Sequence, residues 1–503
     1  MARALVRAIA ALFLAAPLHN ALLSQRSTVV QAGRPSEASM AMLPMTSSSA
    51  AAKMHAMLGQ RALETNHALE AAQHFQQAIE ADSTLAFARL GAANASTSYA
   101  EYDANLRAAA KLAEHASRAE QLQIAIARKS LVNDLVGAES LARELIAAEP
   151  KNPRAYLALA SAQQQMGREV EARRTLERAI AIGPNFSAAH RQLSFSYMAA
   201  QPTDAAKARP YVDRLIALEP TEAQTFITQG SYFRAMNQLP RARSAYSRAA
   251  ELDPTMALPF QQRGHVASFM GDYDAARADY DAAIKLGKQN EAGSYGVFRA
   301  LVAVHAGNPK QAIAELDRLV GEIDGMKLSD PLGAKIGALD AEIQVATQSG
   351  DFTSAARAIA LRTPLVREQV AGASDETVKR IAEGRIAYYE GMLAARQGDS
   401  LAAKAKADEL RKVLAGTNDP QKEQGAHAIL GVLALEQKDF AAAASHLAQA
   451  NPNDVYLMYE RALALDGAGQ PSDAKALFKK VSLFNFNSPD VAFAHREAVK
   501  RSH

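Results

Sequence analysis

The chain has 503 residues, contains neither cysteine nor tryptophan, and carries a formal net charge of +3. Without cysteine it can form no disulfide, no thiolate metal site and no lipid-modified cysteine. The basic excess lies in the first 50 residues, so the rest of the chain has no net charge and lacks the overall basic field that drives non-specific nucleic-acid binding. Nucleic acid is therefore not expected as a partner of this chain.

Residues 1–24 are predicted to be a secretory signal sequence. Arg3 and Arg7 precede an apolar run from Ala8 to Leu18, which is the order of a basic start and a short apolar core. Because a membrane-spanning helix needs about 20 apolar residues, this run is too short to be one. We therefore expect a periplasmic or secreted protein with no transmembrane span, or a cytoplasmic one if this segment is not a functional signal.

Residues 25–51 are rich in Ser, Thr, Gly, Pro and Met and show no helical periodicity, so they are predicted to be a flexible linker. The serines at its end are candidates to cap the first helix with a hydroxyl group.

The stretch from Ala223 to Pro254 is predicted to be a helix hairpin. Phe226, Gly230 and Phe233 recur at intervals of four and three, so they share one face of a first helix. A turn follows, and Pro240 suits the first position of a second helix because its missing N–H would be unpaired there. The second helix places Ala242 and Tyr246 on one face. The small residues let the helix backbones approach, and the aromatic residues fill the space around them.

Small residues recur at the same point of successive hairpins from residue 52 onwards. A chain of this length would normally hold about three domains, but repeats add without a single closed core. The steps between the markers are 33, 34, 34, 36, 34, 34 and 36 residues. The markers are Ala71, Ala104, Ala138, Ala172, Ala208, Ala242, Ala276 and Ala312.

A period near 34 residues with small and large residues in fixed phase resembles the tetratricopeptide repeat family. The resemblance is carried by the Ala223–Pro254 unit and by Leu58, Gly59, Ala71, Phe75 and Ala78, then Tyr156, Leu159, Ala160, Ala172, Ala179 and Pro184. It implies an all-α fold, a right-handed α-solenoid of helix-turn-helix hairpins, with about seven repeats over residues 52–290.

Residues 291–488 are predicted to hold divergent hairpins with longer helices and loops, because the marker alanines become irregularly spaced. Residues 489–503 are predicted to form a C-terminal capping helix. Ser488 can cap it, Pro489 suits its first turn, and Phe484, Phe486 and Phe493 can cover the open end of the last hairpin.

Chemical motifs are not found: there is no phosphate-binding glycine loop, no dinucleotide fingerprint, no nucleophile elbow and no HExxH. His67 and His74 are expected on a solvated face, as are the aspartates between Asp272 and Asp281. We therefore expect no catalytic residue, no metal and no cofactor.

The resemblance implies that a partner lies along the concave surface, lined by the second, fifth, ninth and twelfth residues of each repeat. This stripe contains arginines and no acidic residue in the four best repeats, so it predicts a peptide or protein partner with acidic or carboxylate groups. Ala56 and Gln60 depart from the pattern by which chaperone-binding members clamp a carboxylate. The candidate partner-binding residues, called here the predicted row, are Arg154, Gln164, Arg191, Phe195, Gln224, Ile227, Ser231, Arg234, Gln261 and His265.

Three functional hypotheses follow. The first is a non-enzymatic interaction scaffold in the bacterial cell envelope that holds a peptide or protein partner in its groove. The second is a cytoplasmic regulatory or sensor array, which an intact N-terminus on the purified protein would favour. The third is an enzyme with an unmarked site in the region 325–450, where longer loops could bring ionisable groups together.

Overall fold

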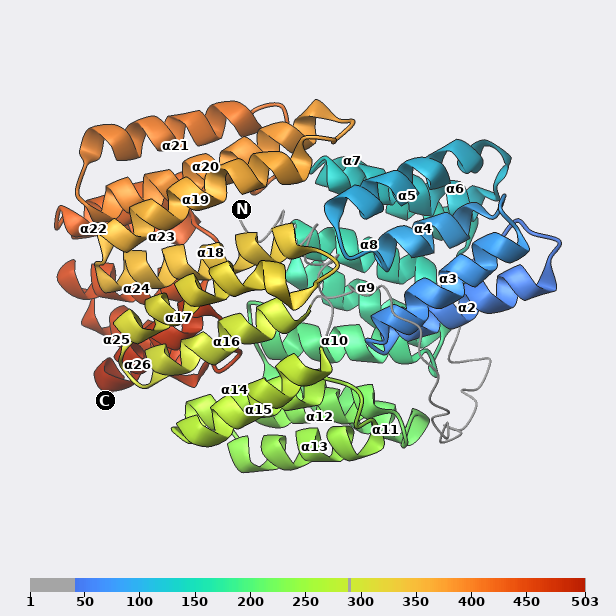
Figure 1. The fold of residues 1–503 in the computed structure, drawn as a ribbon, viewed down its shortest axis with the longest axis horizontal. Coiled ribbons are helices and arrows are strands. Elements are labelled where there is room, and N and C mark those ends of the chain that lie inside the picture. Colours follow the sequence, from blue (N-terminus) through green and yellow to red (C-terminus); the bar gives the residue numbers. More distant parts are fainter. Residues whose placement is uncertain (1–40, 288–290, 503) are drawn as a thin grey trace. The chain divides into compact units, whose positions relative to one another are not determined.

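The structure is a computed structural model that describes residues 41–287 and 291–502, and within these ranges it contains helices and no β-strand (Figure 1). Consecutive helices pack as antiparallel hairpins, which confirms the predicted all-α solenoid. The predicted signal sequence, residues 1–24, and the linker up to residue 40 lie outside the described residues.

The first half of the chain forms the helices α2 to α13. Their bounds are α2 (Ala50–Glu64), α3 (Ala68–Ala81), α4 (Ala86–Asn94), α5 (Tyr99–Leu112), α6 (Arg118–Leu131), α7 (Leu135–Ala148), α8 (Pro153–Gln165), α9 (Glu169–Ile182), α10 (Ser187–Ala199), α11 (Arg209–Leu218), α12 (Ala223–Ala235) and α13 (Leu239–Leu252), with short 3₁₀ turns η2 (Ala113–His115) and η3 (Ala205–Ala208).

The second half continues with helices of which α18, α19 and α20 are the longest, with 19, 19 and 21 residues. Their bounds are α14 (Leu258–Met270), α15 (Tyr273–Leu286), α16 (Glu291–His305), α17 (Pro309–Glu322), α18 (Pro331–Ser349), α19 (Phe352–Val370), α20 (Glu376–Arg396), α21 (Ser400–Leu414), α22 (Gln424–Glu436), α23 (Phe440–Gln449), α24 (Val455–Gly467), α25 (Pro471–Leu483) and α26 (Pro489–Arg501), with the 3₁₀ turn η4 (Ile323–Met326).

Most hairpin turns contain one residue in the left-handed region. Gly271 and Gly307 have φ values of 77° and 84°, and Asn237 has 55°. Glycine and asparagine tolerate this conformation best, and it lets the chain leave one helix and enter the next within a few residues. The turn chemistry therefore fixes the repeat length as much as the core does.

Small residues allow the two helices of a hairpin to touch. A Cβ on Gly230 would come within 2.4 Å of the Tyr246 ring, and one on Gly264 within 2.9 Å of the Tyr280 ring. Both tyrosines are fully buried, and so are the marker alanines Ala242 and Ala276, as the repeat pattern predicted. The rings thus pack directly on the backbone of the facing helix.

Two details of the Ala223–Pro254 hairpin differ from the prediction. Phe226 and Phe233 are only partly buried, and arginine side chains from the second helix lie over their rings, with 4.0 Å from the Arg241 guanidinium carbon to the Phe233 centroid. Tyr246 alone fills the space beside Gly230. Pro240 is the second residue of α13, because the helix begins at Leu239.

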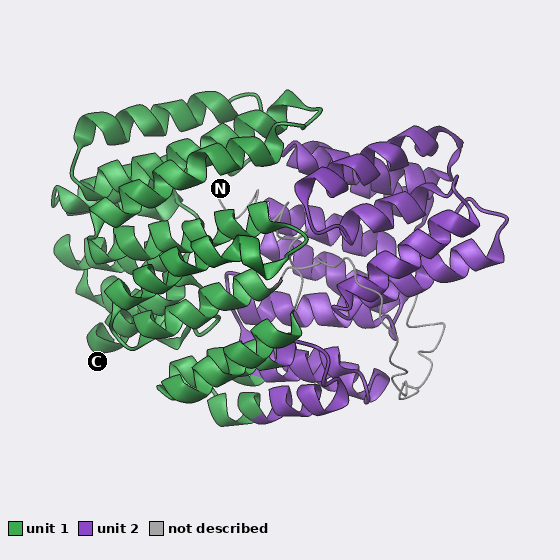
Figure 2. Ribbon diagram, in the orientation of Figure 1, with its two compact units in different colours: residues 1–2, 233–243, 260–503 green, residues 3–232, 244–259 purple. Residues whose placement is uncertain are grey.

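The chain divides into two compact units (Figure 2). Among described residues, the N-terminal unit contains residues 41–232 and 244–259, and the C-terminal unit contains residues 233–243 and 260–502. The division falls in α12 to α14, inside the regular repeats, whereas the change of repeat character was predicted near residue 290.

The start of the described chain packs on the N-terminal unit. Residues 41–49, which the composition assigned to the flexible linker, form an extended segment in which Leu43 is 4% exposed. Leu43 packs against α6, α7 and α8, and its neighbour Thr46 donates its N–H to Glu120 at 2.7 Å. Ser49 accepts a hydrogen bond from the N–H of Ala52, which confirms the predicted serine cap and starts α2 at Ala50.

The C-terminal helix α26 begins at Pro489 and is capped by Ser488, whose Oγ accepts from the N–H of Val491, as predicted. Its apolar face packs on the last hairpin, against Tyr459 and Phe478. It also contacts α16 and α18, which lie far earlier in the chain. The helix is therefore more than a lid on the last hairpin.

Candidate functional site

The predicted row runs along the first helices of successive hairpins, and its most exposed member is on α10. Phe195 is 51% exposed, which is unusual for a large aromatic side chain in this chain. Gln164 of α8 is partly buried and accepts a hydrogen bond from Gln192 at 2.8 Å. These three residues form an accessible patch with one apolar and two amide side chains.

The arginines of the row in the N-terminal unit are already paired with carboxylates of the chain itself. Arg154 Nη1 lies 2.6 Å from Glu64 Oε1, and Arg191 Nη2 lies 2.7 Å from Glu219 Oε2. Their side chains are 10% and 14% exposed. Arg154 also donates from Nε to the carbonyl of Ala41 at 2.7 Å. These groups hold the first hairpin and the N-terminal segment against α8 and α10.

Glu219 is the centre of this network. It receives Arg61 at 2.6 Å on one oxygen and Arg191 on the other, and its side chain is only 4% exposed. Burial alone would raise the pKa of Glu219, but the attraction of Arg191 and Arg61 outweighs it and lowers the pKa. Beside it, Asn66 donates to Gln224 of the predicted row at 2.7 Å.

Other members of the row serve the packing of the N-terminal unit. Ile227 is 4% exposed, and Ser231 Oγ lies 3.2 Å from the hydroxyl of Tyr246. Both positions were predicted to line the partner-binding surface. In the structure, Ile227 and Ser231 lie where α12 meets its neighbours.

In the C-terminal unit the row contacts residues Phe484–Asn487, called here the FNFN segment. Arg234 is 2% exposed beneath the ring of Phe486, and its carbonyl accepts from the amide of Asn485 at 2.7 Å. His265 is 3% exposed, and its Nδ1 lies 3.3 Å from Asn487 Nδ2. Linear spacing gave no sign that this distant segment would cover the row.

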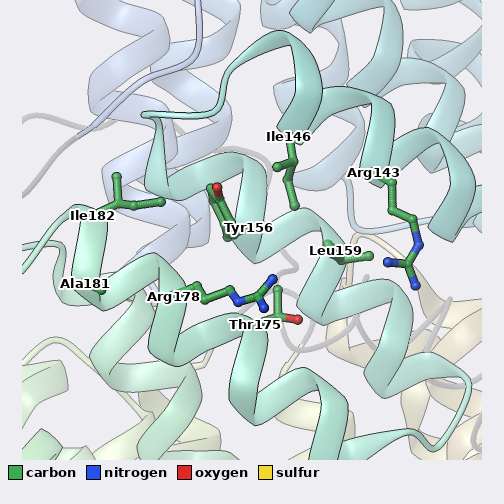
Figure 3. Close-up of a pocket in the computed structure, with 8 residues that line it drawn as sticks. All are labelled: Arg143, Ile146, Tyr156, Leu159, Thr175, Arg178, Ala181 and Ile182. Atoms are coloured by element: carbon green, nitrogen blue, oxygen red, sulfur yellow. The ribbon is translucent and has the colours of Figure 1, made fainter.

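A separate pocket of about 600 Å³ lies between α7 and α9, over α8 (Figure 3). Its apolar lining includes Ile146, Tyr156 and Leu159, and Arg143 and Arg178 are at its rim. Figure 3 shows Arg178 beside Thr175 on α9, with Ile146 and Arg143 on the helix across the pocket. Sequence reasoning missed it because its residues come from three helices and share no spacing.

Buried ionisable groups also gather in the region 325–450, where an enzymatic site was considered. Arg362 and Arg385 both pair with Asp340, and Arg362 lies over the ring of Tyr389. The two arginines are 1% and 7% exposed. Guanidinium groups do not exchange protons near neutral pH, and the Asp340 carboxylate is bound between the two of them, so the cluster joins α18, α19 and α20 by ion pairs.

Glu342 is the one carboxyl group of α18 whose pKa suits proton transfer. Burial raises its pKa to about 7, against the opposing attraction of Arg357. However, its side chain is 0% exposed, so a substrate has no access to it.

The two histidines that the sequence singled out have protein partners, and so do Asp272, Asp279 and Asp281. His67 Nε2 lies 3.0 Å from Asp253, and His74 Nδ1 lies 3.2 Å from His55 Nδ1, so neither is purely solvated. Asp279 is 6% exposed and pairs with Arg263, whereas a hydrophilic face was expected. Across residues 41–287 and 291–502, no three His, Asp or Glu side chains are arranged to hold a metal ion.

None of the helices in the described ranges combines the length and the apolar character needed to cross a membrane.

Comparison with known proteins identifies the repeats. Two family models described as tetratricopeptide repeat match the chain, one over residues 132–194 and again over 434–495, the other over 262–326. No curated protein matches it.

Solved structures of repeat proteins are similar at low identity. MamA 41-end from Desulfovibrio magneticus RS-1 is 18% identical, with a TM-score of 0.29, covering 34% of this chain and 96% of that one. A tetratricopeptide repeat protein from Parabacteroides merdae ATCC 43184 is 15% identical, with a TM-score of 0.37 and coverage of 53% and 98%. The Cut9-Hcn1 hetero-tetramer of the APC/C is 15% identical, with a TM-score of 0.40 and coverage of 89% and 76%.

These TM-scores carry no argument about function, and the family assignment rests on the matched models together with the hairpin geometry. The left-handed turns, the glycine–tyrosine contacts and the marker alanines occur in phase with the matched residues. The chain contains tetratricopeptide repeats, matched over residues 132–194, 262–326 and 434–495.

Proposed function

We propose that this chain is a non-enzymatic scaffold that binds a peptide segment of a protein partner along the predicted row. Tetratricopeptide repeats are protein-interaction modules, and the coarse role of an interaction scaffold follows from the fold. The observation that carries the finer proposal is Phe195, which is 51% exposed at the centre of the row in the N-terminal unit.

Phe195 supports this proposal because a half-exposed aromatic ring beside amide groups is a suitable anchor for a peptide. Aromatic side chains supply much of the energy of interfaces when a partner buries them. Gln192 lies on the same helix as Phe195, and Gln164 lies on α8. The two amides bond to each other, and their remaining donor and acceptor positions can serve an extended backbone or side chains. The patch therefore combines one apolar contact with polar groups that fix orientation.

The predicted acidic groups of the partner would have to exchange with carboxylates of the chain itself. Arg154 and Arg191 already bind Glu64 and Glu219. A partner carboxylate would have to replace one of these internal carboxylates, which costs the desolvation of the group it displaces. We propose that acidic groups on the partner add to binding at this point and that the aromatic contact provides the main part.

The proposed location is the bacterial cell envelope, supported by the basic and apolar start of the sequence. N-terminal sequencing of the native protein tests it. A mature N-terminus after the apolar run supports export, and an intact Met1 supports the cytoplasmic alternative.

The binding surface is tested by affinity capture from an envelope extract with the chain and with Phe195→Asp. The substitution places a charge at an exposed position, so the fold should tolerate it. Arg191→Glu is a poorer probe, because it would set two carboxylates together at Glu219. We expect Phe195→Asp to lose the captured partner.

The matched control is Ile182→Asp at the pocket between α7 and α9, where the Ile182 side chain is 36% exposed. It should capture the partner as the unmodified chain does. Equal capture by Phe195→Asp, or loss of capture in the pocket variant alone, would move the binding surface away from the predicted row.

A further inference from the structure

The FNFN segment occupies the row of the C-terminal unit in the way a bound peptide would. It connects α25 to α26 and lies against α12, α14 and α16, which are more than 170 residues earlier in the chain. The segment has no regular secondary structure. Its hydrogen bonds to α12, α14 and α16 come from side chains of the segment.

The two asparagines of the segment bind the row by hydrogen bonds. Asn485, which is 2% exposed, donates from Nδ2 to the carbonyl of Arg234 at 2.7 Å. Asn487 Nδ2 lies 3.3 Å from the hydroxyl of Tyr280 and 3.3 Å from His265 Nδ1, and its Oδ1 lies 3.1 Å from His305 Nε2. Because an amide oxygen only accepts, His305 carries its proton on Nε2.

The aromatic residues of the segment supply the apolar part of the contact. The ring of Phe486 lies 4.4 Å from the Arg234 guanidinium carbon, in a cation–π arrangement, and 5.7 Å from the ring of Phe484. Phe484 also belongs to the apolar cluster of the last hairpin, together with Phe269. The aromatic and amide side chains thus alternate: Phe486 contacts Arg234 of the row, and Phe484 packs on the last hairpin.

This alternation is how a groove recognises an extended peptide, with pockets for some side chains and hydrogen bonds for others. The surface that receives it contains a buried arginine, two buried histidines and a buried tyrosine hydroxyl. Buried polar groups of this kind are costly when left without partners. The row is therefore built to be covered by amide and aromatic groups.

We propose that the FNFN segment is an internal ligand, which a partner peptide replaces at Arg234, His265 and His305. That partner peptide is extended and has an asparagine–aromatic–asparagine sequence. This inference rests on the proposed function and deepens it. The tethered segment competes at an effective concentration on the order of millimolar. A free peptide therefore binds the intact chain weakly and binds a chain with a released segment more tightly.

The experiment uses a fluorescent peptide with the sequence of residues 482–490 and the full chain carrying Asn485→Ala and Asn487→Ala. Fluorescence anisotropy should show at least tenfold tighter binding to this variant than to the unmodified chain. Adding Arg234→Ala should abolish the gain, and a peptide with both asparagines replaced by alanine should not bind. The matched control chain carries Asn451→Ala and Asn453→Ala in the turn before α24, and it should bind as weakly as the unmodified chain.

Hydrogen exchange on the unmodified chain is a second test that does not depend on the variant folding. With excess free peptide, the amides of residues 484–487 should exchange faster, while those of α24 and α25 stay protected. Segment amides as protected as α24 and indifferent to the peptide would overturn the proposal.

Two further outcomes would overturn the proposal. Equal binding of the peptide by all the chains would mean that the row does not recognise the peptide's sequence. Dimerisation of the released variant without peptide binding would assign the row to a second copy of the chain. If Phe195→Asp loses the envelope partner while the peptide fails to bind, the proposed function stands and only this inference falls.

Discussion

Glu219 provides the sharpest test of how the N-terminal unit is held together. In Glu219→Gln, Arg61 and Arg191 would lose the carboxylate that lies 2.6 and 2.7 Å from them while remaining 13% and 14% exposed. Removing one partner of a buried ion pair typically costs 3 to 5 kcal/mol. The amide keeps the shape and one acceptor oxygen, so we expect a loss of about 3 kcal/mol, near the lower end.

This loss should appear in the first hairpin, because Arg61 is on α2. Hydrogen exchange with mass spectrometry should show α2 and α3 opening about a hundredfold more often, the equivalent of that free energy. The control is Glu251→Gln, which removes an exposed pair with Arg248 in which the side chains are 64% and 53% exposed. Such pairs contribute about 0 to 1 kcal/mol.

Unchanged exchange of residues 50–64 in Glu219→Gln would refute the reasoning, as would an equal effect of Glu251→Gln. Either result would mean that the first hairpin is held by apolar packing alone and that the paired carboxylate contributes little.

The remaining predictions concern pH and backbone contact. Burial lowers the pKa of His305 from 6.5 to about 4, so the unfolded chain binds the proton first as the pH falls. The folded state therefore loses stability between these two pH values, by about 2 kcal/mol at pH 5. Denaturant unfolding at pH 7.5 and at pH 5 measures this loss. His305→Phe should reduce the stability difference between the two pH values by about this amount, while His265 and His495, whose pKa values burial also lowers, keep the rest, and an unchanged difference would contradict the assignment. Gly230→Ala should destabilise the fold by about 1 to 3 kcal/mol, because its Cβ would lie 2.4 Å from the Tyr246 ring. Gly337→Ala, inside α18 with nothing near its Cβ, should stabilise the fold by about 0.5 to 1 kcal/mol. Thermal unfolding followed by circular dichroism compares the two variants, and equal shifts would count against close backbone packing at Gly230.

The fold was largely predictable because it is local. The period of the marker alanines and the facing tyrosines specify each hairpin from residues less than 40 positions apart, and Ala242 and Tyr246 are buried as that pattern requires. The partly buried state of Phe226 was not predictable from spacing. It depends on Arg248, whose long side chain covers the ring from the second helix.

The candidate site was only partly predictable, since it depends on contacts between distant residues. The register placed Phe195 and Arg191 on one stripe, but it could not show that Glu219 would neutralise Arg191 or that Asn487 would cover His265. Such contacts arise when a solenoid of finite length brings early and late hairpins of one unit together. No period in the sequence records them.

The C-terminal segment illustrates the same limit. Its aromatic residues predicted a cap on the last hairpin, and Phe484 does contribute to that cluster. The asparagines between them carried no signal in the sequence. Their roles become visible only because Asn485 and Asn487 meet Arg234 and His305 in the structure.

Photo-crosslinking in the native envelope extract tests the central claim, that a partner peptide binds along the predicted row, most directly. A benzophenone amino acid is placed at position 195, where Phe195 is 51% exposed, and in a separate chain at position 182, where Ile182 is 36% exposed at the pocket between α7 and α9. We expect a crosslinked second polypeptide from position 195 and none from position 182. Adducts from position 182 alone, or from neither position while the partner is still captured, would contradict it.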